Sequence, residues 1–270
     1  MRLDRLKKYA RAPWAIEPGA LAGLMESANG ALPAMPQVER EEDGSEVVDG
    51  VAVISISGVI DHDASELDVA FGSADVATIR EHIALALADS SVSAIVLDFD
   101  SPGGRITGVP ELAAYISKAS AQKPIVSFTD SMMASAAYWL ASGSAAIVST
   151  PSADVGSIGV YIPVLDVSGY YERMGVSVDL IKAGDLKAAG YPGTTLSDDQ
   201  RADLQQGVDE VFAMFKTSVS ASRQVNPAAM RGQSLMGAKA KEYGLIDELG
   251  DIEDAVELAK TLGSMSTSRA

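Results

Sequence analysis

Four apolar runs of strand length, separated by segments with a helical pattern, constrain the fold of this chain more than any other feature. The runs cover residues 51–57, 94–99, 125–128 and 145–149. Between the first two, apolar side chains recur every three or four residues over 76–87, which predicts an amphipathic helix. Strands that are apolar on both faces and alternate with helices are typical of a parallel sheet built from βαβ units. The pattern therefore predicts the α/β fold class.

The rest of the chain adds a fifth strand and further helices to this prediction. Ser197 followed by Gln200 resembles the capping box that opens a helix. The predicted strand covers residues 176–181, and the predicted helices cover residues 110–116, 134–142, 204–219 and 255–259. The last two of these helices give the chain a helical C-terminal part.

The two ends of the chain differ in composition from this core. Residues 1–46 begin with five basic side chains among the first eleven and continue through prolines and an acidic run, which predicts an N-terminal extension or arm. The core domain is predicted over residues 47–262, and the Ser-rich residues 263–270 are expected to form a disordered tail. No stretch has the length and apolarity of a membrane span or a signal peptide, so we expect a cytoplasmic protein with no integral membrane segment.

The composition excludes several kinds of site. A formal net charge of −16 argues against binding to a nucleic-acid backbone. The absence of cysteine excludes disulfides, thiolate metal sites and cysteine nucleophiles. With only two histidines, His62 and His82, a histidine-rich zinc site is not expected. We therefore expect no metal and no cofactor.

The first candidate for chemistry is the segment Asp100-Ser-Pro-Gly-Gly104, which directly follows an apolar strand. Ligands of open α/β sheets bind at the carboxyl ends of the strands. Two adjacent glycines let main-chain N–H groups approach a ligand with no Cβ in the way, which an oxyanion hole requires. The alternative is an ordinary Pro-Gly turn.

The second candidate is Ser135, which follows the strand over residues 125–128 and opens a predicted helix. A serine at such a strand-to-helix turn presents its hydroxyl above the sheet. Its small neighbours Ala134, Ala136 and Ala137 leave room for the main chain of a substrate. The alternative is a serine that only caps the helix.

A nucleophilic serine needs a base. Both histidines precede Ser135, so the chain order Ser, His, Asp is impossible. A lysine base must be uncharged at neutral pH, which burial with few counter-charges favours. Lys187 lies in a loop of small residues, whereas the later lysines fall on predicted helices and Lys182 ends a strand. Another candidate is Ser157, in the segment Gly156-Ser-Ile-Gly-Val160, because its hydroxyl could hydrogen-bond a neutral lysine and orient it. The alternative is that this segment is only a turn before a strand.

Taken together, these residues resemble the Ser/Lys signal peptide peptidase A family, especially its single-repeat members and the related phage head-maturation proteases. The resemblance covers about residues 50–255, with 22 residues from Ser135 to Ser157 and 52 from Ser135 to Lys187. The segments that carry it, in the family's order, are Ser101–Gly104, Met133–Ser135, Gly156–Gly159, Ile181–Lys187 and Ala240–Gly250.

The resemblance implies a ClpP/crotonase-like peptidase domain over residues 47–262 and a role for each site residue. Ser135 would be the nucleophile, Lys187 the general base and Ser157 the group that orients the lysine. The oxyanion hole would be formed by Gly104 and Ala136, and the substrate-binding residues would be Gly103, Arg105, Gly156 and Ile158. Family members form homo-oligomeric rings or domes, in which a neighbouring protomer can supply the lysine.

One departure and one further similarity refine this expectation. Ala136 and Ala137 stand where many relatives have two glycines, which narrows the floor of the cleft. The N-terminal segment over residues 9–18 looks like the start of phage and prophage members, so we expect a serine endopeptidase that acts in capsid or scaffold maturation, in the cytoplasm or within a procapsid. Its expected partner is a protein or peptide in extended form, with small apolar residues at the cleavage site.

Three alternatives stay open at this point. One is a signal-peptide-peptidase-like protease of membrane quality control. Another is a catalytically idle protein that binds capsid or scaffold. The third is an acyl-CoA hydratase or thioesterase of the same fold.

Overall fold

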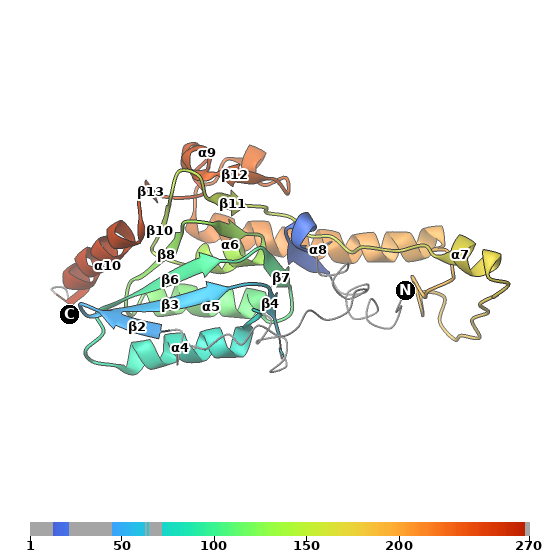
Figure 1. Ribbon diagram of the computed structural model, residues 1–270, viewed down its shortest axis with the longest axis horizontal. Helices are drawn as coiled ribbons and strands as arrows, with labels where there is room; N and C mark the ends of the chain where they lie inside the picture. The colour runs from blue at the N-terminus through green and yellow to red at the C-terminus, as the bar shows by residue number, and fades with distance from the viewer. Residues whose placement is uncertain (1–12, 22–44, 63, 65–71, 268–270) are drawn as a thin grey trace.

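The computed structural model describes residues 13–21, 45–62, 64 and 72–267 (Figure 1). Within these residues the first strands are β1 (Trp14–Ile16), β2 (Ser45–Val48), β3 (Val51–Ser57), β4 (Ile60–Asp61), β5 (Ala74–Asp75), β6 (Ala94–Asp100) and β7 (Gly103–Arg105). The later strands are β8 (Ile125–Thr129), β9 (Met132–Ala134), β10 (Ala146–Ser149), β11 (Asp154–Gly156), β12 (Ser234–Met236) and β13 (Glu248–Leu249). The helices are α4 (Val76–Ala88), α5 (Val109–Ser120), α6 (Ala136–Ala141), α7 (Ser168–Arg173), α8 (Asp198–Ser222), α9 (Gly237–Glu242) and α10 (Ile252–Thr267), with a 3₁₀ turn at Pro227–Ala229.

The largest sheet of the described residues has the strand order β13-β10-β8-β6-β3-β2. All its neighbours pair in parallel except β2, which pairs antiparallel with β3 at the edge. α4 connects β3 to β6, and α5 connects β6 to β8, so the predicted βαβ units and the α/β class are confirmed. The four strands predicted from the apolar runs all belong to this sheet.

Helices cover both faces of this sheet, which explains why its strands are apolar on both sides (Figure 1). Along β6, Ile95 and Leu97 pack in the cluster that contains α4 and α5, whereas Val96 packs in the cluster that contains α10. This alternation follows from the two-residue repeat of a strand. Burial of apolar surface on both faces stabilises the frame that carries the loops at the carboxyl ends of the strands.

Two small sheets lie at those carboxyl ends. One has the order β1-β7-β4-β5 and the other β12-β11-β9. An isolated parallel bridge between Ser101 and Met133 links the segment after β6 to β9. The two candidate segments of the sequence, at Ser101–Gly104 and at Ser135, are therefore held side by side by main-chain pairing.

The helix α8 begins at the predicted capping box, in which the Ser197 hydroxyl accepts from Gln200 N and the Gln200 side chain accepts from Ser197 N. Its second half packs on the core, where Phe215 stacks on Trp139 of α6 with ring centroids 4.4 Å apart. Its first half and α7 extend away from the sheet as an arm (Figure 1). We call residues 162–197 the arm segment.

The strand predicted over residues 176–181 is wrong. These residues lie in the arm segment, are mostly exposed and pair with no strand among the residues that the structure describes. A short alternating run becomes a strand only where a neighbour takes up its main-chain hydrogen bonds, and the isolated chain offers none there.

The ends of the chain also differ from the prediction. Residues 13–21 are not a loose arm, because Trp14–Ile16 forms β1 and its side chains are buried. The tail does not begin at residue 263, because α10 continues to Thr267. The expectations for residues 1–12, 22–44 and 268–270 lie outside the described residues. Among the helices of the described part, none combines the length and apolarity needed to span a membrane.

The C-terminal signature over residues 240–250 fastens the end of the chain to the sheet. The Tyr138 hydroxyl donates to the Leu245 carbonyl at 2.8 Å. The Asp247 carboxylate accepts from Ile147 N and from the guanidinium of Arg223, both at 2.7 Å. These contacts give the segment a structural role, because it bonds to elements of the core and not to Ser135.

Candidate active site

Ser135 sits at a strained turn between β9 and α6. Its φ of 57° and ψ of −116° lie outside the regions that a side chain normally allows. Its N–H donates to the Gly156 carbonyl at 2.7 Å, which holds the turn against β11. The side chain is 1% exposed, and its Oγ has no hydrogen-bond partner among the described residues. A buried hydroxyl without a partner costs about 1–3 kcal/mol, so this one is kept at the expense of stability.

Gly103 lies against the same turn, and Gly104 lies against Ile60 of β4. A Cβ at Gly103 would stand 2.7 Å from Ala136 N and 2.9 Å from the Ala134 carbonyl oxygen. A Cβ at Gly104 would stand 1.8 Å from the Ile60 carbonyl oxygen. Neither position has room for a side chain.

The N–H groups next to Ser135 differ in their availability. The N–H of Gly103 donates to Ser101 Oγ at 3.2 Å, and that hydroxyl donates to the Gly58 carbonyl at 2.6 Å. The N–H of Ala136 belongs to the first residue of α6 and so has no acceptor within the helix. The predicted pair of oxyanion donors, Gly104 and Ala136, stays a prediction.

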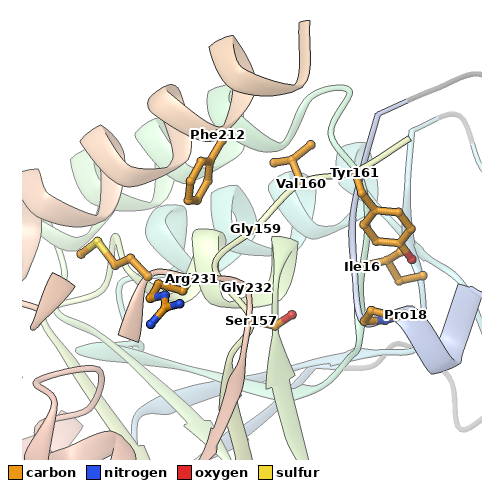
Figure 2. A pocket seen from close by; sticks show the side chains of 10 residues that line it. Ile16, Pro18, Ser157, Gly159, Val160, Tyr161, Phe212, Arg231 and Gly232 are labelled. Atoms are coloured by element: carbon orange, nitrogen blue, oxygen red, sulfur yellow. The ribbon is translucent and has the colours of Figure 1, made fainter. Parts of the chain in front are cut away.

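Ser157 follows β11 and has a positive φ of 50°. Its N–H donates to the Gln233 carbonyl at 3.0 Å. It lines a cavity of about 320 Å³ together with Ile16, Pro18 and Phe212 (Figure 2). Ile158 points elsewhere, since its side chain is fully buried in the main core. A substrate could therefore contact only the main chain of Ile158.

The Arg105 side chain makes its contacts within the protein. Its Nε lies 3.6 Å from Asp61 Oδ1, and its guanidinium lies over the Trp14 ring, 5.4 Å from the centroid. The predicted contact of Arg105 with a substrate stays a prediction. In the single chain this side chain braces β1 and β4.

Lys187 is not joined to Ser135 within one chain. It is exposed, in the arm segment between α7 and α8, and that segment extends away from α6 (Figure 1). The hydroxyl of Ser135, by contrast, is buried. The structure thus brings the serine, the glycine loop and Ser157 together, and it places the lysine on the exposed arm segment.

Two titratable groups with shifted pKa values were not singled out by the sequence. Burial, and then the charges of Asp130 and Asp100, raise the pKa of Asp98 to about 6. Burial also raises the pKa of Tyr161 to about 12. No sequence signal marks either, because both shifts arise from packing. No three His, Asp or Glu side chains gather as a metal site within the described part of the chain.

Comparison with known proteins decides the family. The sequence model of peptidase family S49 matches residues 117–266, which include Ser135, Ser157 and Lys187. The chain belongs to peptidase family S49. The predicted relation to signal peptide peptidase A and to phage head-maturation proteases is confirmed.

Two phage proteins are among the relatives of this S49 chain. It is 32% identical to the head-tail preconnector protein GP5 of Enterobacteria phage P21 over 218 residues, 80% of this chain and 44% of that protein. It is 30% identical to the capsid assembly protease C of Escherichia phage lambda over 224 residues, 82% of this chain and 51% of that protein. The S49 chain spans about half the length of these relatives.

A solved structure with a similar fold is that of the 1510-N membrane-bound stomatin-specific protease. The similarity covers 78% of this chain and 85% of that chain, with 15% identity and a TM-score of 0.43. At this TM-score the family assignment depends on the sequence matches alone.

Proposed function

We propose that this S49 chain is a serine endopeptidase in which Ser135 is the nucleophile. One observation carries the proposal: a strained, buried serine whose hydroxyl has no partner lies beside Gly103, where a side chain would collide with Ala136 N. Strain and an unsatisfied hydroxyl both lower stability, and such costs collect at functional sites. A serine that only capped a helix would use its hydroxyl for a main-chain N–H, and Ser135 makes no such bond.

The proposed reaction is acyl transfer to Ser135 followed by hydrolysis. The lysine accepts the hydroxyl proton while Oγ attacks the scissile carbonyl, and the same proton then goes to the leaving amine. The N–H groups of Gly104 and Ala136 would stabilise the oxyanion, each by about 3–4 kcal/mol in the transition state. Water then releases the acyl group from Ser135.

The proposed base is Lys187 of a neighbouring copy. In one chain this side chain is exposed on the arm segment, so the site is incomplete without a second protomer. An oligomer in which the arm of one copy reaches the cleft of the next would bring the amine to Ser135, and Ser157 would orient it. Homo-oligomers with head-to-tail interfaces close into rings, which agrees with the ring or dome expected for the family.

The proposed substrate is an extended protein segment with a small apolar residue at the cleaved bond. β7 lies inside one of the small sheets beside Ser135, and the place next to it is taken by β1, an antiparallel strand of the kind that an extended peptide could replace. Ala136 and Ala137 directly follow Ser135 and are fully buried, and their methyl groups narrow the place that a substrate side chain would take. Two relatives are named for capsid assembly and head-tail connection, so we propose capsid or scaffold protein as the natural substrate.

The test of this function is hydrolysis of an unstructured protein such as casein. Ser135→Ala should lower the rate at least ~10³-fold, because the nucleophile is lost while the buried methyl leaves the fold intact. Ser220→Ala is the matched control, since Ser220 is exposed on α8 and should leave the rate unchanged. A Ser135→Ala protein that still hydrolyses casein at the wild-type rate would refute the proposal.

A further inference from the structure

A segment of the chain's own N-terminus occupies the place where a substrate strand would lie. On one side Trp14 N donates to the Tyr161 carbonyl at 2.9 Å, and Tyr161 N donates to the Trp14 carbonyl at 3.1 Å. On the other side β1 pairs antiparallel with β7, with Ala15 opposite Gly104. Residues 14–16 are thus a strand held between the glycine loop and the segment that follows Ser157.

The register of this strand places the Ala15 carbonyl at one of the two proposed oxyanion donors, the N–H of Gly104. Glu17 N donates to the Pro102 carbonyl at 2.8 Å. Because hydrogen-bonded pairs alternate along an antiparallel ladder, Ala15 and Gly104 form the next such pair. The N–H of Gly104 therefore faces the Ala15 carbonyl.

A second geometric fact agrees with this register. A Cβ built on Gly103 would stand 2.3 Å from the Ala15 carbonyl oxygen and 2.7 Å from Ala136 N. These two atoms are thus at most about 5 Å apart, the sum of the two distances. The Ala15 carbonyl oxygen thus faces the N–H of Gly104 and lies within about 5 Å of Ala136 N, the two groups that the proposed function assigns to the oxyanion hole.

The side chains fit the same interpretation. Ala15 is fully buried within the main core cluster, as a small residue in a narrow pocket would be. Trp14, Ile16 and Leu21 form a separate buried cluster against Val59 and Tyr161.

The chain that follows Ala15 runs along the cavity that Ser157 lines. Ile16 and Pro18 line that cavity opposite Phe212 and Arg231 (Figure 2). The cavity therefore lies where the residues after a scissile bond would leave the cleft.

We infer that the Ala15–Ile16 peptide bond is this protein's own cleavage site, and that residues 13–21 block the cleft until the bond is cut. The inference rests on the proposed function, because it uses Ser135 as the nucleophile. In the cut, a bond forms between Ser135 Oγ and the Ala15 carbonyl carbon, and the bond to Ile16 N breaks. The serine proton passes through the base to Ile16 N, and water then frees the carboxylate of Ala15. The products are residues 1–15 and a chain that starts at Ile16.

The experiment follows the intact mass of the purified full chain with time and, in parallel, its hydrolysis of casein. Wild-type protein should lose residues 1–15, and casein hydrolysis should accelerate as this fragment leaves. Ser135→Ala should keep its full mass. Ala15→Leu should slow the loss at least ~10-fold, because the buried position has no room for the larger side chain. Ala77→Leu, at an exposed position of α4, is the matched control and should not change the time course.

Two further measurements separate the outcomes. Ala15→Gly fits the pocket and should still be cut, so it shows that any effect of Ala15→Leu is one of size and not of misfolding. Hydrolysis of casein at full rate from the first time point, with residues 1–15 still attached, would overturn the inference and leave Ser135 as the nucleophile. Cleavage at a bond other than Ala15–Ile16 would overturn the inferred register of β1 in the cleft. A chain that cuts neither itself nor casein would refute the proposed function and the inference with it.

Discussion

The exchange Gly104→Ala adds a single methyl group where the structure has no space for it. The new Cβ would stand 1.8 Å from the Ile60 carbonyl oxygen, whereas ordinary contact begins at 3.4 Å. The nearest atoms are all main chain of Ile60, so no side chain can turn away. β4 and β7 must therefore separate by roughly 1.6 Å, the difference between those two distances.

The size of the effect follows from that displacement. Overpacking of this kind costs about 1–3 kcal/mol of unfolding free energy. The N–H of Gly104 moves by more than ~1 Å from the oxyanion position, which is enough to lower catalysis ~10²-fold. If that donor is lost altogether, the decrease reaches ~10³-fold, or about 4 kcal/mol.

The assay is the initial rate of casein hydrolysis, with thermal unfolding measured on the same sample. Gly207→Ala is the matched control, because it makes the same chemical change in α8 with nothing within 4 Å of the new Cβ. It should raise the unfolding free energy by about 1 kcal/mol and leave the rate unchanged. If Gly104→Ala keeps a rate within threefold of wild type (a factor set by the ~10² expected), then the N–H of Gly104 does not serve the transition state and the reasoning is refuted.

Three further predictions concern the base and the fold. Inactive Ser135→Ala and Lys187→Ala proteins, dissociated and reassembled together, should recover roughly a quarter of the wild-type rate if the lysine acts across the interface, and none if it acts within its own chain. Burial raises the pKa of Asp98 to about 6, so its contribution to stability is present below about pH 4 and is lost as pH rises through 6. The difference in unfolding free energy between Asp98→Asn and wild type should therefore be ~1–2 kcal/mol more favourable to the variant at pH 7.5 than at pH 4, after allowance for the partial exposure of Asp98. Urea titrations that give the same difference at both pH values would contradict this. Tyr138→Phe removes the buried bond to Leu245 and should cost about 1–3 kcal/mol in the same titrations, and a cost below ~0.5 kcal/mol would mean that this bond does not hold the C-terminal segment.

The central sheet could be predicted because its cause is local in the sequence. Strands covered on both faces must be apolar throughout, and residues 94–99 and 125–128 show that directly. The position of Ser135 could be predicted for the same reason. A short connection after a strand of a parallel sheet puts the next residue at the carboxyl edge of that sheet. These features need no knowledge of distant contacts.

The features that the sequence did not predict depend on distant partners. Trp14–Ile16 is only three residues long and is flanked by Pro13 and Pro18, so no periodic pattern marks it as a strand. It becomes one because β7 and Tyr161 supply main-chain partners on its two sides. Residues 176–181 have the alternation of a strand and lack such partners in one chain, so they stay extended and exposed.

Lys187 belongs to the same group of features. In one chain it is exposed on the arm segment, and no local pattern in the sequence places it relative to Ser135. The serine could therefore be predicted as a position, whereas the pair of serine and lysine could be predicted only through the resemblance to the family.

The most direct measurement is covalent labelling of the active protein with a fluorophosphonate, followed by peptide mapping. Serine hydrolases take up this probe at the activated hydroxyl, so one phosphonyl group should appear per chain, on the peptide that contains Ser135. Lys187→Ala should slow its uptake at least ~10²-fold, since the hydroxyl then has no base. A label on a different serine, or full hydrolytic activity in a protein with Ser135 completely labelled, would contradict the account.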